Sequence, residues 1–342
     1  MEGSDREDET GLDYFFGKGM KIMKIAFWSN THGLCCNTTQ LGIISIWYAL
    51  QRPDAHCVIM ENHKNLFGIS RMLYRPIASE SQIYYRYGGL GTLMRHLGKG
   101  DMSLLEMEFM AERFVGERLM YFPIGADMGP EQLDYYLERD LRRLFLLLDK
   151  RIDHTWIDTS PSACTTRAIL NAADGVVVSL SQNRIVLDNL FSNHRELHKK
   201  AFYIIGNYEA DSDLTKDEIV SLYGLSNDRV AVIPHDAGMM DAISKGTLIP
   251  YIMQAFHCEV HEKGFEMARA LRDAMDAFFC WLGDEEETHI DEKGVSGYPA
   301  MVAEGNIKRY PSFVAENGVN RYNVHPGNRF CNSRESIGMQ QG

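Results

Sequence analysis

The residues best placed to do chemistry stand in a short polar turn near the N-terminus, "NTHGLCCNTT", residues 30–39. An apolar run, 24–28, precedes this turn, and a helical pattern over 38–51 follows it. A strand, a turn and a helix form the layout of a phosphate-binding loop, in which backbone N–H groups and the helix N-terminus face the phosphates. The turn nevertheless has a single glycine, Gly33, and lacks the lysine that normally reaches the β- and γ-phosphates.

Two interpretations of the turn follow from its residue types. In the register that fits best, Asn37 takes the lysine position and Thr38 supplies the hydroxyl that holds Mg²⁺. Cys35 and Cys36 then stand where small residues are needed, because the backbone must approach the phosphates closely. The alternative is an ordinary strand-to-helix turn, with Thr38 or Thr39 near the helix cap.

The elements that position this turn are predicted from apolar runs rich in Val, Ile, Phe or Tyr. These runs are residues 24–28, 56–60, 119–124, 154–159, 175–180, 201–208 and 230–235. Helical patterns lie between most of them, over residues 38–51, 129–150, 164–174, 185–200 and 215–224. Strand–helix alternation over roughly 230 residues predicts an α/β fold with a mostly parallel, doubly wound sheet and helices on both faces. Such sheets bind ligands at the carboxyl ends of their strands.

Composition narrows the class of protein. Among 342 residues, 47 acidic against 35 basic side chains give a net charge of −12. This charge makes DNA binding an unfavoured expectation, although a local basic patch stays compatible with it. No run approaches the ~18–20 apolar residues of a transmembrane segment. Seven cysteines without CxxC spacing favour a reducing cytoplasm over a disulfide framework, and we expect no metal cluster.

The chain divides into three expected parts. Residues 1–20 are acidic first and apolar later, opposite to a secretory signal, and predict a disordered leader. Residues 21–283 form the nucleotide-binding type of domain, which the amphipathic stretch 261–283 closes as a helix packed on the sheet. A membrane or partner helix is the alternative there, and its mixed charges disfavour it. Residues 284–342 are Gly-, Asn- and Arg-rich and predict an irregular tail.

Two other groups could hold a metal, and both have a plainer interpretation. Cys35 and Cys36 are adjacent, and vicinal thiolates cannot easily share one tetrahedral ion. Small buried side chains are the favoured interpretation for both. His194 and His198 stand four residues apart on a predicted helix, which could place both on one ion. A solvated helix surface is the more common outcome for such a charged segment.

Taken together, the span 24–255 resembles the ParA/MinD family of deviant P-loop ATPases, whose SIMIBI-type P-loop NTPase fold is shared with nitrogenase iron proteins. The family turn reads K-G-G-x-G-K-T-T. Here the same positions carry His32, Gly33, Leu34, Cys35, Cys36, Asn37, Thr38 and Thr39. The resemblance implies that these residues surround the phosphates and that Thr38 would bind Mg²⁺.

Three later segments carry the resemblance more clearly. "WIDTSPSA" is similar to the family's switch segment I-D-T-P-P-G, which implies that Asp158 contacts the Mg²⁺ shell. "FYIIGNY" resembles the strand that ends in V-x-N, which implies that Asn207 reads adenine. "VAVIPHDAGMMDAISKG" resembles the segment beside the nucleotide base, which implies that Pro234, His235 and Asp236 lie there.

Departures from the family pattern concern charge. The signature lysine, which in the family reaches the partner's phosphates across a dimer, is His32, and the ordinary P-loop lysine is Asn37. The switch glycine is Ser162. After the second strand, where the family has acidic residues, Glu61 and His63 remain as candidate catalytic residues that could polarise water. Their alternative is a strand end and loop at the sheet edge.

The expected function follows from this damaged turn. Without both lysines, ATP and Mg²⁺ should bind weakly or not at all, with little hydrolysis. We expect a homodimeric positional or assembly scaffold for a protein partner in a secretion, pilus or partition machinery, cytoplasmic and recruited to a pole or to the inner membrane face. The degenerate branch with TadZ/CpaE-type pilus-localisation proteins is the nearest match, without their receiver-like domain. The alternatives are an active partition-type ATPase that positions DNA or a protein complex, and a redox or small-molecule enzyme, which no convergent acid/base set supports.

Overall fold

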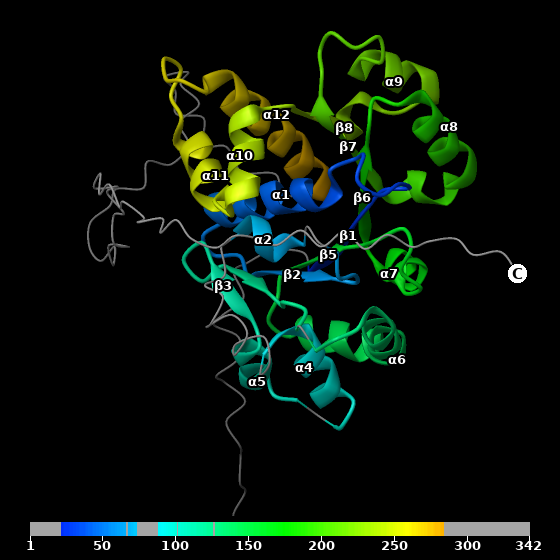
Figure 1. Ribbon diagram of the computed structural model, residues 1–342, viewed down its shortest axis with the longest axis vertical. Coiled ribbons are helices and arrows are strands. Elements are labelled where there is room, and N and C mark those ends of the chain that lie inside the picture. The colour runs from blue at the N-terminus through cyan, green and yellow to red at the C-terminus, as the bar shows by residue number, and fades with distance from the viewer. Residues whose placement is uncertain (1–21, 66–67, 74–87, 101, 126, 284–342) are drawn as a thin grey trace, which may run out of the picture. The chain divides into compact units, whose positions relative to one another are not determined.

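The computed structural model describes residues 22–65, 68–73, 88–100, 102–125 and 127–283 (Figure 1). The predicted leader, 1–20, and the predicted tail, 284–342, lie outside the described residues. The strands are β1 Met23–Trp28, β2 Cys57–Glu61, β3 Glu112–Phe114, β4 Leu119–Tyr121, β5 His154–Asp158, β6 Gly175–Leu180, β7 Ala201–Tyr208 and β8 Val230–Pro234. The α-helices are α1 Asn37–Gln51, α2 Ile69–Leu73, α4 Gly89–Leu97, α5 Leu104–Phe109, α6 Pro130–Leu148, α7 Thr166–Ala172, α8 Arg184–Asn193, α9 Lys216–Tyr223, α10 Ala237–Lys245, α11 Leu248–His257 and α12 Phe265–Leu282.

The strands form one eight-stranded sheet in the order β3-β4-β2-β5-β1-β6-β7-β8. Neighbouring strands run parallel except β3, which is antiparallel to β4. The predicted mostly parallel sheet is therefore confirmed. Strand β3 was not predicted, because its three residues are polar or half-exposed and carry no apolar run. Since β1 lies between β5 and β6, the turn after it opens where the strand order reverses, at a topological switch point.

Helices cover both faces of the sheet, and alternate side chains of each strand point to opposite layers. Ile25 and Phe27 of β1 belong to the cluster with α1, α2, α10, α11 and α12. Ala26 and Trp28 belong to the cluster with α4, α5, α6, α7, α8 and α9 (Figure 1). A sheet buried on both faces explains the continuous apolar runs of its central strands.

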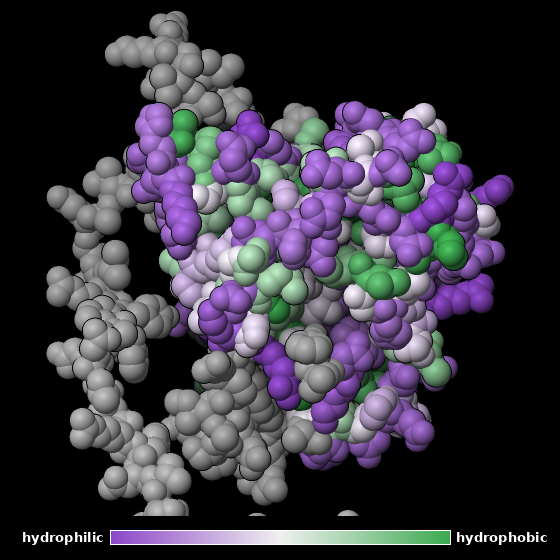
Figure 2. Space-filling model, turned by 45° about the horizontal axis from the view of Figure 1, so that its top comes forward, coloured by the Kyte–Doolittle hydropathy of each residue, from purple (hydrophilic) through white to green (hydrophobic). Residues whose placement is uncertain are grey.

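The last helix, α12, packs on the sheet as the sequence indicates. Ala268, Leu271, Met275 and Phe278 are each 0% exposed and lie against β8 and α11. Among the described helices, none is long and apolar enough to cross a bilayer. The face of the molecule shown in Figure 2 is mostly hydrophilic, with small scattered hydrophobic areas.

The predicted helix over 185–200 is wrong in its second half. Helix α8 ends at Asn193, and a 3₁₀ helix, Arg195–Lys200, follows. His194 sits at the junction with its ring 4.8 Å from the Trp28 ring, whereas His198 Nδ1 lies 3.1 Å from the Tyr203 hydroxyl. The two histidines therefore do not share one helical face, which removes the basis for the paired metal-ligand alternative.

Helix α6 offers a matched pair of leucines that tests its packing. Leu144 is 0% exposed and Leu146 is 58% exposed. We predict that Leu144→Ala lowers the free energy of unfolding by about 2–5 kcal/mol, because it leaves a cavity in the core. Leu146→Ala should change it by less than about 0.5 kcal/mol. Urea denaturation measures both, and equal losses would contradict the packing of α6 on the sheet through this face.

Candidate functional site

The candidate site lies where the carboxyl ends of β1, β2 and β5 meet. In the sheet register, Asp158 of β5 is level with Phe27 of β1 on one side and with Glu61 of β2 on the other. The turn of residues 29–36 leaves β1 at this edge, and α1 begins directly after it at Asn37. The predicted phosphate-loop position and the predicted acidic residue are thus neighbours in space.

Asn37 directs its side chain back into the sheet. Its Nδ2 donates to the Phe27 carbonyl at 3.0 Å and to Asp158 Oδ1 at 2.6 Å. The Ser179 hydroxyl of β6 lies 2.8 Å from Asn37 Oδ1. Both ends of the amide are therefore engaged within the chain. At the position where a P-loop lysine would face a phosphate, this side chain instead joins β1, β5 and β6, while Thr38 beside it is half-buried.

The turn before α1 is closed against β7. Cys36 adopts a left-handed backbone with φ 57° and ψ 31°, a conformation that suits glycine. Cys35 is buried, and its carbonyl accepts a hydrogen bond from Gln40 Nε2 at 3.0 Å. A Cβ on Gly206 of β7 would lie 2.4 Å from the same nitrogen, so only glycine fits beneath the turn. Sequence reasoning missed Gln40 and Gly206, because no motif marks a contact between segments so far apart.

Burial also changes the acidity of the two thiols. The pKa of Cys35 is raised chiefly by burial, and hydrogen bonds from Thr31 and Ser181 only partly oppose this. For Cys36, burial and the neighbouring Cys35 raise the pKa to about 11. Both thiols are therefore protonated at neutral pH, which makes them poor nucleophiles and poor metal ligands.

His32, at the family's signature position, contacts its own chain. Its Nε2 lies 3.1 Å from Ser160 Oγ and 3.0 Å from Ser162 Oγ, both in the segment that follows β5. Gly33, with φ 78°, and Leu34, 54% exposed, form the outer tip of the turn. The ring thus links the turn to the predicted switch segment within one chain.

The residues expected beside a nucleotide base lie at the ends of β7 and β8, farther along the same edge. Asn207 is exposed and has a left-handed backbone, φ 47°. It stands where the pairing of β7 with β8 shifts register before Tyr208 pairs with Pro234. This bulge turns Asn207 away from the ladder.

The next two residues are occupied differently. His235 Nδ1 lies 3.2 Å from Glu209 Oε1 in an exposed ion pair. Asp236 is the N-cap of α10: its Oδ1 accepts from the Met239 amide at 2.6 Å and from the Tyr251 hydroxyl at 2.7 Å. The structure therefore gives Asp236 a capping role at the start of α10.

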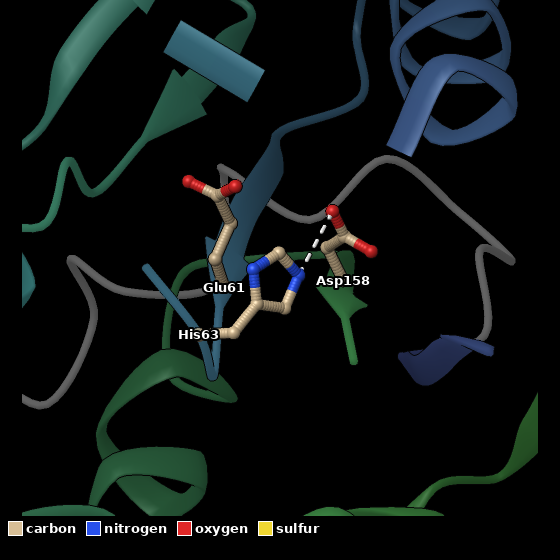
Figure 3. Close-up of side chains that lie close together, drawn as sticks. All are labelled: Glu61, His63 and Asp158. Atoms are coloured by element: carbon tan, nitrogen blue, oxygen red, sulfur yellow. Dashed lines mark ion pairs between the residues drawn. The ribbon is translucent and has the colours of Figure 1, made fainter. Parts of the chain in front are cut away.

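Glu61, His63 and Asp158 form a buried group at the ends of β2 and β5 (Figure 3). Their exposed fractions are 3%, 8% and 1%. Glu61 accepts from the Ile69 amide at 3.0 Å and from the Tyr121 hydroxyl at 2.6 Å. His63 Nε2 lies 3.3 Å from Asp158 Oδ2. The sequence predicts each of these residues separately, and the structure brings all three together.

Burial sets the acid–base character of this group. It raises the pKa of Glu61 above its usual range, with the nearby Asp158 adding to the effect. Burial alone would lower the pKa of His63, but the carboxylates of Asp158 and Glu61 outweigh it and leave that pKa raised. Since both Glu61 oxygens already accept protein hydrogen bonds, Glu61 is poorly disposed to activate a water molecule as a base.

Comparison with known proteins places the fold. No family model matches the sequence, and no curated protein matches it either. Among solved structures, the septum site-determining protein MinD complexed with Mg-ADP from Pyrococcus horikoshii OT3 aligns at 14% identity and TM-score 0.54, covering 74% of this chain and 96% of its own. The cell division ATPase MinD of Pyrococcus furiosus aligns at 14% and 0.53, over 75% and 99%. A ParA family ATPase from Chlorobium tepidum TLS aligns at 15% and 0.52, over 75% and 99%. The chain therefore has the fold of the ParA/MinD P-loop ATPases.

The closed turn leads to a prediction about thiol reactivity. We expect iodoacetamide to modify Cys36 much more slowly at pH 8 than the exposed Cys164 and Cys280, because thiolate is the reactive form. The rate at Cys36 should still be rising steeply between pH 8 and pH 10. Peptide mass spectrometry separates the sites, and equal rates at Cys36 and Cys164 throughout would contradict the closed turn.

The bridging role of Asn37 gives a second prediction. Asn37→Asp keeps the shape but removes two donated hydrogen bonds and sets a carboxylate beside Asp158, so unfolding free energy should fall by at least about 1–3 kcal/mol. The paired carboxylates would bind protons more tightly in the folded chain than in the unfolded one, so the deficit should shrink as pH falls toward 5. Chemical denaturation at several pH values measures it.

The control for this experiment is Asn193→Asp, at the exposed end of α8. We expect a change there of less than about 0.5 kcal/mol, nearly constant with pH. A pH-independent deficit in Asn37→Asp would show that the two carboxyl groups do not face each other.

Proposed function

We propose that this chain is a dimeric positional or assembly scaffold built on the ParA/MinD fold, which holds ATP weakly or not at all and hydrolyses little of it. One observation carries the proposal. Asn37, at the P-loop lysine position, spends its amide on Phe27, Asp158 and Ser179 rather than offering a charge to a phosphate.

Charge at the γ-phosphate is the first reason to expect slow turnover. The other position that carries lysine in the family is His32, whose ring is engaged with Ser160 and Ser162. Phosphoryl transfer depends on fixed positive charge, and removing one such stabilising group lowers turnover by about 10²–10³-fold. Loss at two positions therefore supports a protein that uses the fold for binding rather than for catalysis.

Space in the turn is the second reason. Cys36 carries a side chain where the family has glycine, and Cys35 is packed beneath it against β7. Thr38, Asp158 and the N-terminus of α1 are retained, and a helix N-terminus attracts anions unaided. Weak, Mg²⁺-assisted nucleotide binding therefore stays compatible with the proposal.

An active partition-type ATPase is the second candidate, favoured by the fold it shares with a MinD protein solved with Mg-ADP. It would position DNA or a protein complex in an ATP-dependent way. The missing lysines and the net charge of −12 make it the weaker candidate.

The scaffold would act through a protein partner. We infer that it binds a component of a localised assembly, of the secretion, pilus or partition kind, and is recruited to a pole or to the inner membrane face. TadZ/CpaE-type pilus-localisation proteins, on the degenerate branch of the family, are the pattern for this role. Dimerisation without a nucleotide requirement is the feature that separates a standing scaffold from an ATP-driven switch.

A calorimetric titration with ATP and Mg²⁺, combined with size-exclusion light scattering, tests the proposal. We expect no saturable heat at micromolar concentrations and the same dimer mass with and without nucleotide. Micromolar binding that drives dimerisation would instead establish the ATPase candidate. Thr38→Ala then tests the location of any weak binding, which should disappear if Thr38 holds the Mg²⁺.

A restored turn provides the matched gain-of-function variant. It combines the four substitutions that return the family pattern, His32→Lys, Leu34→Gly, Cys36→Gly and Asn37→Lys. If charge and crowding are what weaken binding, this variant should bind ATP and Mg²⁺ at least about tenfold more tightly than the natural chain. A folded variant without that gain would show that the site lacks something other than the lysines and glycines.

A further inference from the structure

We propose that Glu61, His63 and Asp158 bind a single divalent transition-metal ion, of the manganese-to-zinc class, without any nucleotide. Each residue offers one ligand atom, and the three atoms lie within 4.8 Å of one another. Two carboxylate oxygens and one imidazole nitrogen are a donor set that suits such ions. This ion is distinct from the Mg²⁺ that a nucleotide would bring to Thr38.

The spacing of two of these atoms supports an ion between them. His63 Nε2 and Asp158 Oδ2 are 3.3 Å apart. A hydrogen bond between an imidazolium and a carboxylate is normally about 2.7–2.9 Å long. Two ligands that each lie about 2.0–2.1 Å from a tetrahedral ion are about 3.3 Å apart. The pair is therefore spaced more like two ligands of one ion than like a strong hydrogen bond.

Two buried polar atoms in this group lack a hydrogen-bond partner among the described residues. They are Asp158 Oδ2 and His63 Nδ1. Figure 3 shows the imidazole lying between the two carboxyl groups. A buried polar atom without a partner is uncommon in proteins and destabilises the fold by about 1–3 kcal/mol. A bound cation satisfies Asp158 Oδ2 directly, which makes this the second observation pointing to a ligand.

The surroundings orient the ligands in the way that metal sites require. Asn37 Nδ2 donates to Asp158 Oδ1 at 2.6 Å, which leaves Oδ2 directed at His63. Tyr121 and Ile69 hold the Glu61 carboxylate, and each carboxylate oxygen keeps a further lone pair for an ion. Hydrogen bonds of this kind fix the direction of coordinating carboxylates and raise affinity.

Charge favours the same conclusion. Two carboxylates beside one neutral imidazole carry a charge of −2 in a region almost closed to water, where unbalanced charge is strongly unfavourable. A divalent ion balances this charge completely. The competing arrangement has no ion and keeps a proton on Glu61 and on both His63 nitrogens, and metal loading distinguishes the two.

An ion here would act on the sheet edge. It would join the ends of β2 and β5, which are adjacent in the sheet at Glu61 and Asp158. It would also place fixed positive charge close to the turn whose lysine positions are His32 and Asn37. The site would therefore be structural, and it would not depend on the nucleotide behaviour proposed above.

The test is metal loading of the full chain in the absence of nucleotide. The purified chain is stripped with a chelator, dialysed against Zn²⁺ or Mn²⁺, and analysed by inductively coupled plasma mass spectrometry and thermal melting. We expect about one ion per chain with at least one metal and a rise in Tm. Mn²⁺ is included because it prefers oxygen and imidazole ligands to thiolates. Failure to retain either ion would overturn the proposal.

Variants identify the ligands. Glu61→Gln and His63→Asn should each lose the bound ion, whereas His261→Asn, at an exposed histidine before α12, should keep it. If the first two fail to fold, Tyr121→Phe removes only the hydroxyl that holds Glu61, and it should weaken binding by about 10–100-fold. Unchanged loading in Glu61→Gln and His63→Asn, or an unchanged affinity in Tyr121→Phe, would contradict the assignment.

Discussion

The hydrogen bonds of the Asn37 amide are the interaction on which the arrangement of the sheet edge depends. They connect the carbonyl of β1, the carboxylate of Asp158 on β5 and the hydroxyl of Ser179 on β6, at the residue where α1 begins. The Ser179 hydroxyl also lies 2.6 Å from Gln40 Oε1, and its one hydrogen serves only one acceptor at a time. The turn, three strands and the first helix are thus held by one small group of neutral side chains. Where an active P-loop protein has a mobile cation, this chain has a fixed amide.

Much of the fold was predictable from the sequence, because strands buried on both faces must be apolar along their whole length. The runs at 175–180 and 201–208 coincide with β6 and β7 for this reason. Strand β3 has no such run, and its place at the sheet edge depends on pairing with β4. The break after Asn193 also escaped prediction, because periodic apolar residues continue past it and no proline or glycine marks the end of α8.

The positions of the candidate site residues were predictable, but the directions of their side chains were not. A motif places Asn37 before the helix, yet only the tertiary structure shows that its amide faces Asp158, more than a hundred residues away in the chain. The same is true of His32, which contacts Ser160 and Ser162 rather than reaching outward. Gln40 and Gly206 carry no recognisable pattern, because their importance comes from mutual contact. Motifs report the chemistry available at an edge, and long-range packing decides how it is used.

Gly206 has a consequence for how the two halves of the site respond to a ligand. It lies beneath the Gln40 side chain and the Cys35 carbonyl, and the next residue is Asn207, at the bulge between β7 and β8. A movement of the turn would press on β7, and a movement of Asn207 would be resisted by the turn. The edge that would meet a phosphate and the edge that would meet a base are therefore mechanically coupled. Any molecule recognised here must fit a preorganised surface, because induced fit at one end would require rearrangement at the other.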